Sequence, residues 1–250
     1  MVMHRKGVRI PVIAPTYYRS LLTSDEQELY KVIVNDLIKH KKTIYVSQNN
    51  LSYDVIQRVV KAIHFDHPEL FFVNFWQYHF QQILTPFDVR IEFQMLLDKG
   101  AANSVANTLA IHADALQNKM EPEMSLKQKY YQVVKKIAST TTYVDSGSGF
   151  WDHTCVGPIL KGSGVCESIA KLFLYFCQRL QLPCAILTGT LNGIPHAWNM
   201  IEINNTLRYI DVTSLLNTSF CYALFPIVMF RNEDDLRQNG YKWEKTTSIP

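Results

Sequence analysis

Three residues in the second half of the chain have the side chains that acyl-transfer chemistry requires. Cys166, His196 and Asp211 follow one another in that order. A cysteine can attack the carbonyl carbon of an amide or ester, and a histidine can take its proton and later return one to the leaving group. A carboxylate beside the histidine orients the ring and stabilises its charged form. The three residues therefore predict a cysteine-nucleophile enzyme with a Cys-His-Asp triad.

Cys166 has a local setting that suits a nucleophile. It follows Gly162-Ser-Gly164, and apolar residues then recur at steps of three and four from Ile169 to Leu180. This spacing predicts a helix with Cys166 in its first turn. A helix N-terminus favours a thiolate and can stabilise an oxyanion, while the glycines leave room for a substrate.

A lone cysteine is more often a small core residue than a nucleophile. We interpret the other four cysteines in that way, because none of them opens a helix behind glycines: Cys155, Cys177, Cys184 and Cys221.

His196 and Asp211 are expected on neighbouring antiparallel strands. Residues 184–190 predict one strand, and Asn192-Gly193 is a strong signal for a hairpin turn into a second strand at 196–203. A third strand is expected at 207–212. The histidine and the carboxylate would then lie at the same end of one small sheet.

The length of the second turn decides whether these two side chains meet. A two-residue loop at Asn204-Asn205 places Asp211 opposite Trp198 and His196 opposite Thr213. His196 and Asp211 then become diagonal neighbours on one face, roughly 7–8 Å apart. A three-residue loop would put them on opposite faces. We expect the two-residue loop, with Trp198 packed in the core.

Other polar residues near the triad have more ordinary interpretations. Asp152 and His153 precede the nucleophile and are expected to line the entrance to the site, and Asn199 is expected to bind nearby backbone. A metal site is not expected, because only Cys166 and His196 converge and the number of ligands falls short.

The first hundred residues predict an α+β unit in which we identify no chemistry. A capping box at Thr23 and Glu26 opens a helix, and residues 70–80 read as a strand covered on both faces. We assign residues 1–100 to an N-terminal α+β unit and 101–250 to a catalytic domain. The further elements expected are strands at 44–46 and 88–95, the latter paired with 70–80, helices at 51–64, 101–119 and 125–139, and a polar loop at 140–151.

Composition excludes several classes of protein. Apolar residues make up 47% and charged residues 19% of the 250 residues, as in ordered globular proteins. The net charge of +3 is scattered, which argues against nucleic-acid binding, and no run of about 18 apolar residues predicts a membrane span. Five cysteines without CxxC spacing and the lack of a signal peptide favour the cytoplasm.

At the positions of the predicted triad the chain resembles the transglutaminase-like superfamily of papain-fold cysteine enzymes, and its bacterial members in particular. The matching motifs are Gly164-Val-Cys-Glu-Ser-Ile-Ala170, His196-Ala-Trp-Asn199 and Tyr209-Ile-Asp-Val-Thr213. More loosely, 67–72 and 241–250 look like the flanks of those bacterial proteins. The resemblance implies an α+β, papain-like core in which the nucleophile helix packs on an antiparallel sheet. It also implies a thioester intermediate and no cofactor.

The chain departs from the pattern of the superfamily at several positions. Ser168 stands where many relatives have glycine, and Ser214 stands where an aromatic residue often follows the Asp-x-Thr motif. The Tyr-Asp pair that usually precedes the cysteine is replaced by Tyr143-Val-Asp145. In the cross-linking members a tryptophan upstream of the cysteine steadies the oxyanion. Trp151 lies at a different spacing, and the resemblance suggests it as a residue near the oxyanion. His153, from its place in the loop before Cys166, is expected to line the substrate region.

The resemblance leaves the substrate open, because the superfamily includes cross-linkers, peptidases and peptide-glycan amidases. We expect a protein or peptide substrate, and hydrolysis rather than cross-linking, because water is the default acceptor and no residue set recruits a lysine. The alternative is a catalytically inactive module that binds a protein partner through its aromatic surface. A structural domain with a chance triad is the third possibility.

Overall fold

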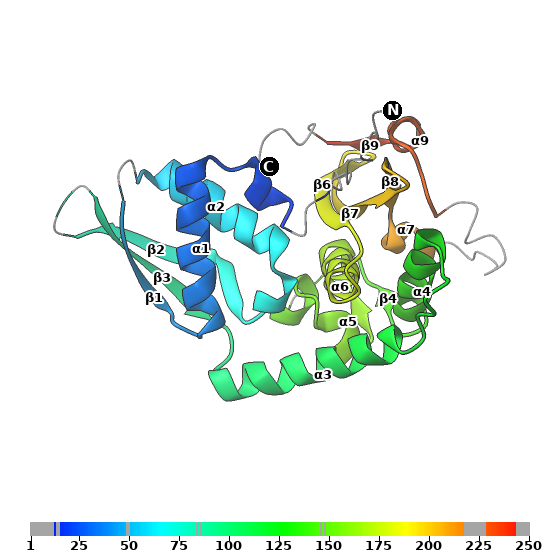
Figure 1. Cartoon of the computed structure of the whole chain (residues 1–250), viewed down its shortest axis with the longest axis horizontal. Helices are drawn as coiled ribbons and strands as arrows, with labels where there is room; N and C mark the ends of the chain where they lie inside the picture. Colours follow the sequence, from blue (N-terminus) through cyan, green and yellow to red (C-terminus); the bar gives the residue numbers. More distant parts are fainter. Residues whose placement is uncertain are drawn as a thin grey trace, which may run out of the picture.

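The computed structural model describes residues 13, 16–48, 51–83, 85, 87–145, 147, 149–217 and 229–243. The chain is α+β (Figure 1). Its N-terminal part places two helices on a three-stranded sheet, and its C-terminal part packs helices on a four-stranded sheet. A long helix, α3, runs along one side of the molecule from the first part towards α4 of the second (Figure 1).

The N-terminal part forms because its local signals agree with its packing. Thr23 and Glu26 make the predicted capping box, and the next helix is capped by the Ser52 side chain. The elements are η1 (Tyr18–Leu21), α1 (Ser24–Ile38), β1 (Thr43–Ser47), α2 (Tyr53–Asp66), η2 (Pro68–Leu70), β2 (Val73–Gln82) and β3 (Asp88–Met95). The antiparallel sheet has the order β1-β3-β2, which confirms the pairing of residues 88–95 with the preceding strand.

The expectation that residues 70–80 are covered on both faces is wrong. β2 is an edge strand, and beyond Phe75 most of its side chains are at least partly exposed. A bulge between Asn74 and Tyr78 interrupts its pairing with β3 and leaves Trp76 67% exposed. An aromatic run has the same composition in a central strand and at an edge, so the sequence could not separate the two.

The C-terminal part contains the residues that the sequence singled out. Its helices are α3 (Lys99–Gln117), α4 (Leu126–Ala138), α5 (Gly157–Leu160), α6 (Cys166–Arg179), α7 (Val212–Asn217) and α9 (Glu233–Gln238), with η3 at Phe150–His153. Its strands β6 (Cys184–Leu191), β7 (Ile194–Ile203), β8 (Thr206–Ile210) and β9 (Tyr241–Lys242) form a four-stranded antiparallel sheet. Their order in the sheet is β8-β7-β6-β9. The short strands β4 (Thr142–Tyr143) and β5 (Ser163–Gly164) form a parallel pair just before α6.

The four-stranded sheet is apolar on both faces. Ile186 and Ile201 belong to the large core cluster that also contains Phe173 of α6. Trp198 and Met200, which alternate with Ile201 along β7, belong to a second cluster on the other face of the sheet. The helix α6, which begins with Cys166, therefore packs on the antiparallel sheet, as expected. The large cluster also includes Phe75 of β2, so apolar packing joins the two parts of the chain; the predicted boundary at residue 100 stays a prediction.

Glycine is favoured at positions 162 and 164, before Cys166, for different structural reasons. Gly162 has a φ of +68°, which favours glycine. At Gly164 a Cβ would collide with Ser168 Oγ and lie 3.0 Å from Pro158. The Ser168 hydroxyl in turn donates to the Val165 carbonyl, 2.9 Å away. The missing side chain of Gly164 thus makes room for the first turn of α6.

Gly164→Ala should lower the free energy of unfolding by roughly 1–3 kcal/mol, because the added methyl group overpacks this turn. Urea denaturation followed by circular dichroism measures the effect. Adding Ser168→Ala should recover part of the loss, because it removes the colliding hydroxyl, with Ser168→Ala alone as the control. Additive losses in the double variant would contradict this account of Gly164.

Candidate active site

Cys166 is the first residue of α6, as the sequence predicted. Val165 precedes it as the N-cap and provides no side-chain cap, so the first N–H groups of the helix have no capping side chain. Cys166 is half-buried, whereas Cys155, Cys177 and Cys184 are buried. Cys221 lies outside the described residues. Among the described cysteines, only Cys166 therefore combines a helix N-terminus with partial exposure.

His196 lies near the start of β7 and is held between the thiol and the carboxylate. Its Nε2 is 2.8 Å from Asp211 Oδ2, and its side chain is 9% exposed. The rings of Trp198 and Tyr241 each lie 6.0 Å from the imidazole, centroid to centroid. Because Nε2 donates to the carboxylate, Nδ1 is the ring nitrogen that remains to exchange a proton with Cys166.

Asp211 meets His196 by a route that differs in part from the predicted one. The turn at Asn204-Asn205 has two residues, and Ile203 pairs with Thr206 as expected. The strand ends at Ile210, however, so the expected pairs of Asp211 with Trp198 and of His196 with Thr213 do not form.

The physical reason is that Asp211 begins a helix instead of ending a strand. Its Oδ1 accepts the backbone N–H of Ser214 at 3.1 Å, which is an N-cap interaction for α7. This use of Oδ1 leaves Oδ2 to face the histidine. The cap therefore fixes the orientation of the carboxylate.

Two residues that sequence reasoning missed also bind this carboxylate. The Ser214 hydroxyl and the Tyr241 hydroxyl each donate to Asp211 Oδ2 at 2.6 Å, and the two hydroxyls are 2.9 Å apart. Ser214 is one of the departures from the superfamily pattern, and Tyr241 reaches the site because β9 pairs with β6. Only the loose likeness of residues 241–250 to bacterial flanks pointed to this segment.

The charges of the triad support each other. Burial alone would lower the pKa of His196, but hydrogen bonds to Asp211 and Cys166 and their charges raise it to about 9. Burial alone would raise the pKa of Asp211, but the hydrogen bond and charge of His196, followed by the hydroxyls of Ser214 and Tyr241, hold it below its usual range. A charged imidazole stabilises a neighbouring thiolate, and the ionised carboxylate of Asp211 keeps the imidazole charged.

The remaining expected residues do not join the triad. His153 Nδ1 lies 3.0 Å from Glu167 Oε2, and Asp152 accepts hydrogen bonds from Gly149 N and Lys161 Nζ. Trp151 is half-buried and packs on Phe150 with ring centroids 4.2 Å apart. A role of Trp151 at the oxyanion, or of His153 towards the substrate, stays a prediction.

Two smaller expectations, those for Asn199 and Trp198, are confirmed beside the site. Asn199 Nδ2 donates to the Ala170 carbonyl at 3.1 Å, and Trp198 is buried. Tyr143 is paired with Gly164 across β4 and β5, and its pKa is raised by partial burial and then by the charge of Cys166.

Within the described residues no group of three or more His, Cys, Asp or Glu is arranged to hold a metal ion, and no helix is long and apolar enough to cross a membrane.

A model of the transglutaminase-like superfamily matches residues 113–212, a range that contains Cys166, His196 and Asp211. Residues 113–212 therefore form a transglutaminase-like region of the chain. Its α+β fold agrees with that assignment, since α6 packs on an antiparallel sheet as in the papain-like core.

Two solved structures are similar to this chain. One is the crystal structure of a TGase, with 13% identity, a TM-score of 0.40, and coverage of 72% of this chain and 52% of that one. The other is a protein from Cytophaga hutchinsonii described as a candidate cysteine protease, with 15% identity, a TM-score of 0.37, and coverage of 56% and 62%. The chain thus spans less than two thirds of either structure, and neither likeness bears on its activity. No curated protein sequence matches it.

The His196 imidazole should titrate at about pH 9, followed by NMR of its ring protons. Asp211→Asn should lower that pKa, whereas Tyr241→Phe, which keeps the carboxylate, should leave it above the ordinary value of about 6.5. Titration of wild-type His196 near pH 6.5 would contradict the buried pair.

The same pair makes stability depend on pH. A histidine whose pKa is raised on folding contributes stability that is present below its unfolded pKa and is lost as the pH rises through its folded pKa. Asp211→Asn should therefore cost on the order of 1–3 kcal/mol more at pH 6 than at pH 10. Urea denaturation at both pH values measures the difference, and an equal cost at both would argue against a charged His196.

Proposed function

We propose that this chain is a transglutaminase-like cysteine hydrolase that cleaves a peptide or amide bond through Cys166. The observation that carries the proposal is the chain of contacts from the Cys166 thiol through His196 to the Asp211 carboxylate. The three groups come from α6, β7 and the β8–α7 junction, and each has the environment that its role requires.

The first half-reaction forms a thioester. The thiolate of Cys166 attacks the carbonyl carbon, and the oxygen of the tetrahedral intermediate takes up the negative charge near the uncapped N–H groups of α6. His196 Nδ1 then gives its proton to the leaving amine nitrogen as the C–N bond breaks. Asp211 stays ionised throughout and stabilises the imidazolium.

The second half-reaction returns the free thiol. Neutral His196 takes a proton from a water molecule, whose oxygen attacks the thioester carbonyl carbon. The C–S bond breaks, and the products are a carboxylic acid and the thiolate–imidazolium pair. We favour water as the acceptor because no described residue set near Cys166 recruits a lysine.

Alkylation by iodoacetamide tests whether Cys166 is activated. At pH 6 we expect fast labelling of Cys166, located by mass spectrometry, and slow labelling of the buried cysteines. His196→Ala should slow the reaction of Cys166 by at least about tenfold, because the thiolate loses its partner cation. His79→Ala is the matched control, since His79 is exposed on β2 and does not line the pocket beside α6. A rate unchanged by His196→Ala would favour the inactive binding module.

The acyl acceptor can be tested with p-nitrophenyl acetate and a primary amine. We expect an acetyl thioester on Cys166, seen by mass spectrometry at low pH, and release of acetate as the main product when the amine is present at about 1 mM. Cys166→Ser is the control for non-specific ester hydrolysis. A predominance of the acetylated amine would reverse the preference and favour cross-linking chemistry.

A further inference from the structure

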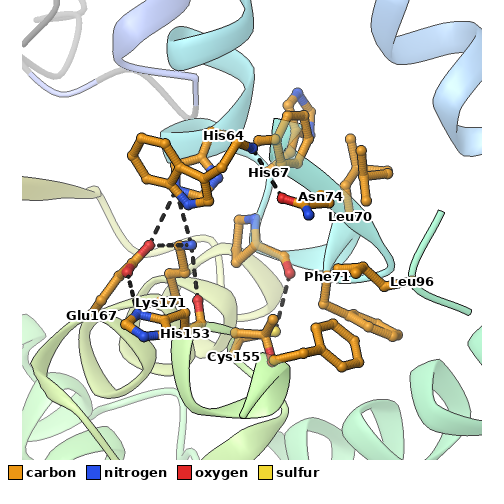
Figure 2. A pocket seen from close by; sticks show the side chains of 16 residues that line it. His64, His67, Leu70, Phe71, Asn74, Leu96, His153, Cys155, Glu167 and Lys171 are labelled. Carbon is orange, nitrogen blue, oxygen red and sulfur yellow. Dashed lines mark hydrogen bonds and ion pairs between the residues drawn. The ribbon is translucent and has the colours of Figure 1, made fainter. Parts of the chain in front are cut away.

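A pocket of about 360 Å³ lies beside the first turn of α6, and we call it the side pocket (Figure 2). Its walls come from α2, η2 and β2 of the N-terminal part, and from η3 and α6 of the catalytic part. Glu167, the residue after Cys166, lines it. Cys166 is not among the lining residues, but it shares the first turn of α6 with Glu167.

The charged groups of the floor are occupied with one another. Glu167 Oε1 lies 2.6 Å from Lys171 Nζ, and its Oε2 lies 3.0 Å from His153 Nδ1. Lys171 Nζ also donates to the His153 carbonyl at 3.0 Å. Figure 2 shows these contacts around Glu167. The carboxylate is therefore neutralised inside the protein and offers little attraction to a cationic ligand.

The ammonium group of Lys171 is equally engaged. Its third neighbour is His64 Nε2 at 3.1 Å, which reaches over from α2. Burial and the charge of Lys171 lower the pKa of His64 to about 4, so this imidazole is neutral, and its Nε2 can either accept from Lys171 or donate to Glu167 Oε1, which is also 3.1 Å away. The ammonium charge is already compensated by the Glu167 carboxylate and the His153 carbonyl, so an anionic ligand would gain little from it.

The walls of the side pocket are apolar. They are formed by Leu70, Phe71, Phe75, Trp76, Leu96 and Phe150. The bulge in β2 is held by Asn74, whose Oδ1 accepts the Trp76 N–H at 3.1 Å and whose Nδ2 donates to Gln94 Oε1 at 2.7 Å. This fixed bulge presents an exposed tryptophan at the pocket, where an apolar partner would cover it.

We propose that the side pocket binds an apolar side chain of aromatic size, belonging to the polypeptide whose carbonyl reaches Cys166. A volume of this size, with mostly apolar walls and a few fixed polar groups, is typical of ligand pockets. Cations and anions are disfavoured because the floor is neutralised internally. This inference rests on the proposed function, which it deepens by assigning substrate selection to the N-terminal part.

Protection of Cys166 from iodoacetamide tests the proposal without requiring turnover. The probes are acetylated hexapeptide amides of glycine and alanine in which one position is Phe, Ala, Lys or Glu. The reaction is run at pH 9, where an accessible thiol is alkylated even when it is not activated. Protection is expressed relative to the rate of each protein variant without peptide.

We expect half-protection by the Phe peptide at a concentration at least about tenfold lower than for the Ala peptide, since burial removes the large apolar surface of an aromatic side chain from water. The Lys and Glu peptides should resemble the Ala peptide. Trp76→Ala should reduce the Phe preference at least about threefold. Leu96→Trp, which narrows the same pocket, should also reduce it.

The matched control is Tyr45→Ala. Tyr45 is 66% exposed on β1 of the same sheet and is absent from the lining of the side pocket, so the Phe preference should stay as in wild type. Equal protection by all four peptides, a preference for Lys or Glu, or a Phe preference unchanged in Trp76→Ala and Leu96→Trp would overturn the proposal. If His196→Ala did not slow the alkylation of Cys166 at pH 6 while the Phe peptide still protected Cys166, the proposed hydrolysis would be contradicted and the proposed binding would stand.

Discussion

The arrangement of the candidate active site depends on one buried carboxylate, that of Asp211. Asp211 follows the last residue of β8, and its Oδ1 caps α7. Its Oδ2 accepts hydrogen bonds from His196 and from the hydroxyls of Ser214 and Tyr241. A buried carboxylate is tolerated only when hydrogen bonds satisfy it. Each donor is therefore required by the charge as well as by the fold, and together they hold the imidazole in one orientation towards Cys166.

A second carboxylate, that of the half-buried Glu167, lies one residue from Cys166. Its negative charge would oppose a thiolate at Cys166 if it stood alone. Lys171 and His153 neutralise it, and His64 from the N-terminal part completes the cluster. The charge of Lys171 and the neighbouring histidines hold the pKa of Glu167 well below its usual range, against the effect of its burial. The first hundred residues, in which the sequence revealed no chemistry, thus contribute a contact to Glu167, the residue after Cys166.

The sequence predicted those features that depend on neighbours along the chain. The capping box of Thr23 and Glu26, the start of α6 at Cys166 and the two-residue turn at Asn204-Asn205 are all confirmed. The errors concern burial and the ends of elements. β2 was expected to be covered on both faces, and Asp211 was expected inside a strand. Both depend on what packs nearby: an edge position exposes β2, and capping by Asp211 ends β8.

By itself the sequence determined the identity and order of Cys166, His196 and Asp211 and the two-residue turn that sets the register of β7 and β8, because turn length is a local property. Only the tertiary structure decided what surrounds them. Tyr241 is separated from Asp211 by 30 residues, and His64 from Glu167 by 103. No local pattern selects such partners: the pairing of β9 with β6 and the packing of α2 beside α6 bring them within hydrogen-bond distance. For the same reason the side pocket, with walls from both parts of the chain, could be recognised only in the folded protein.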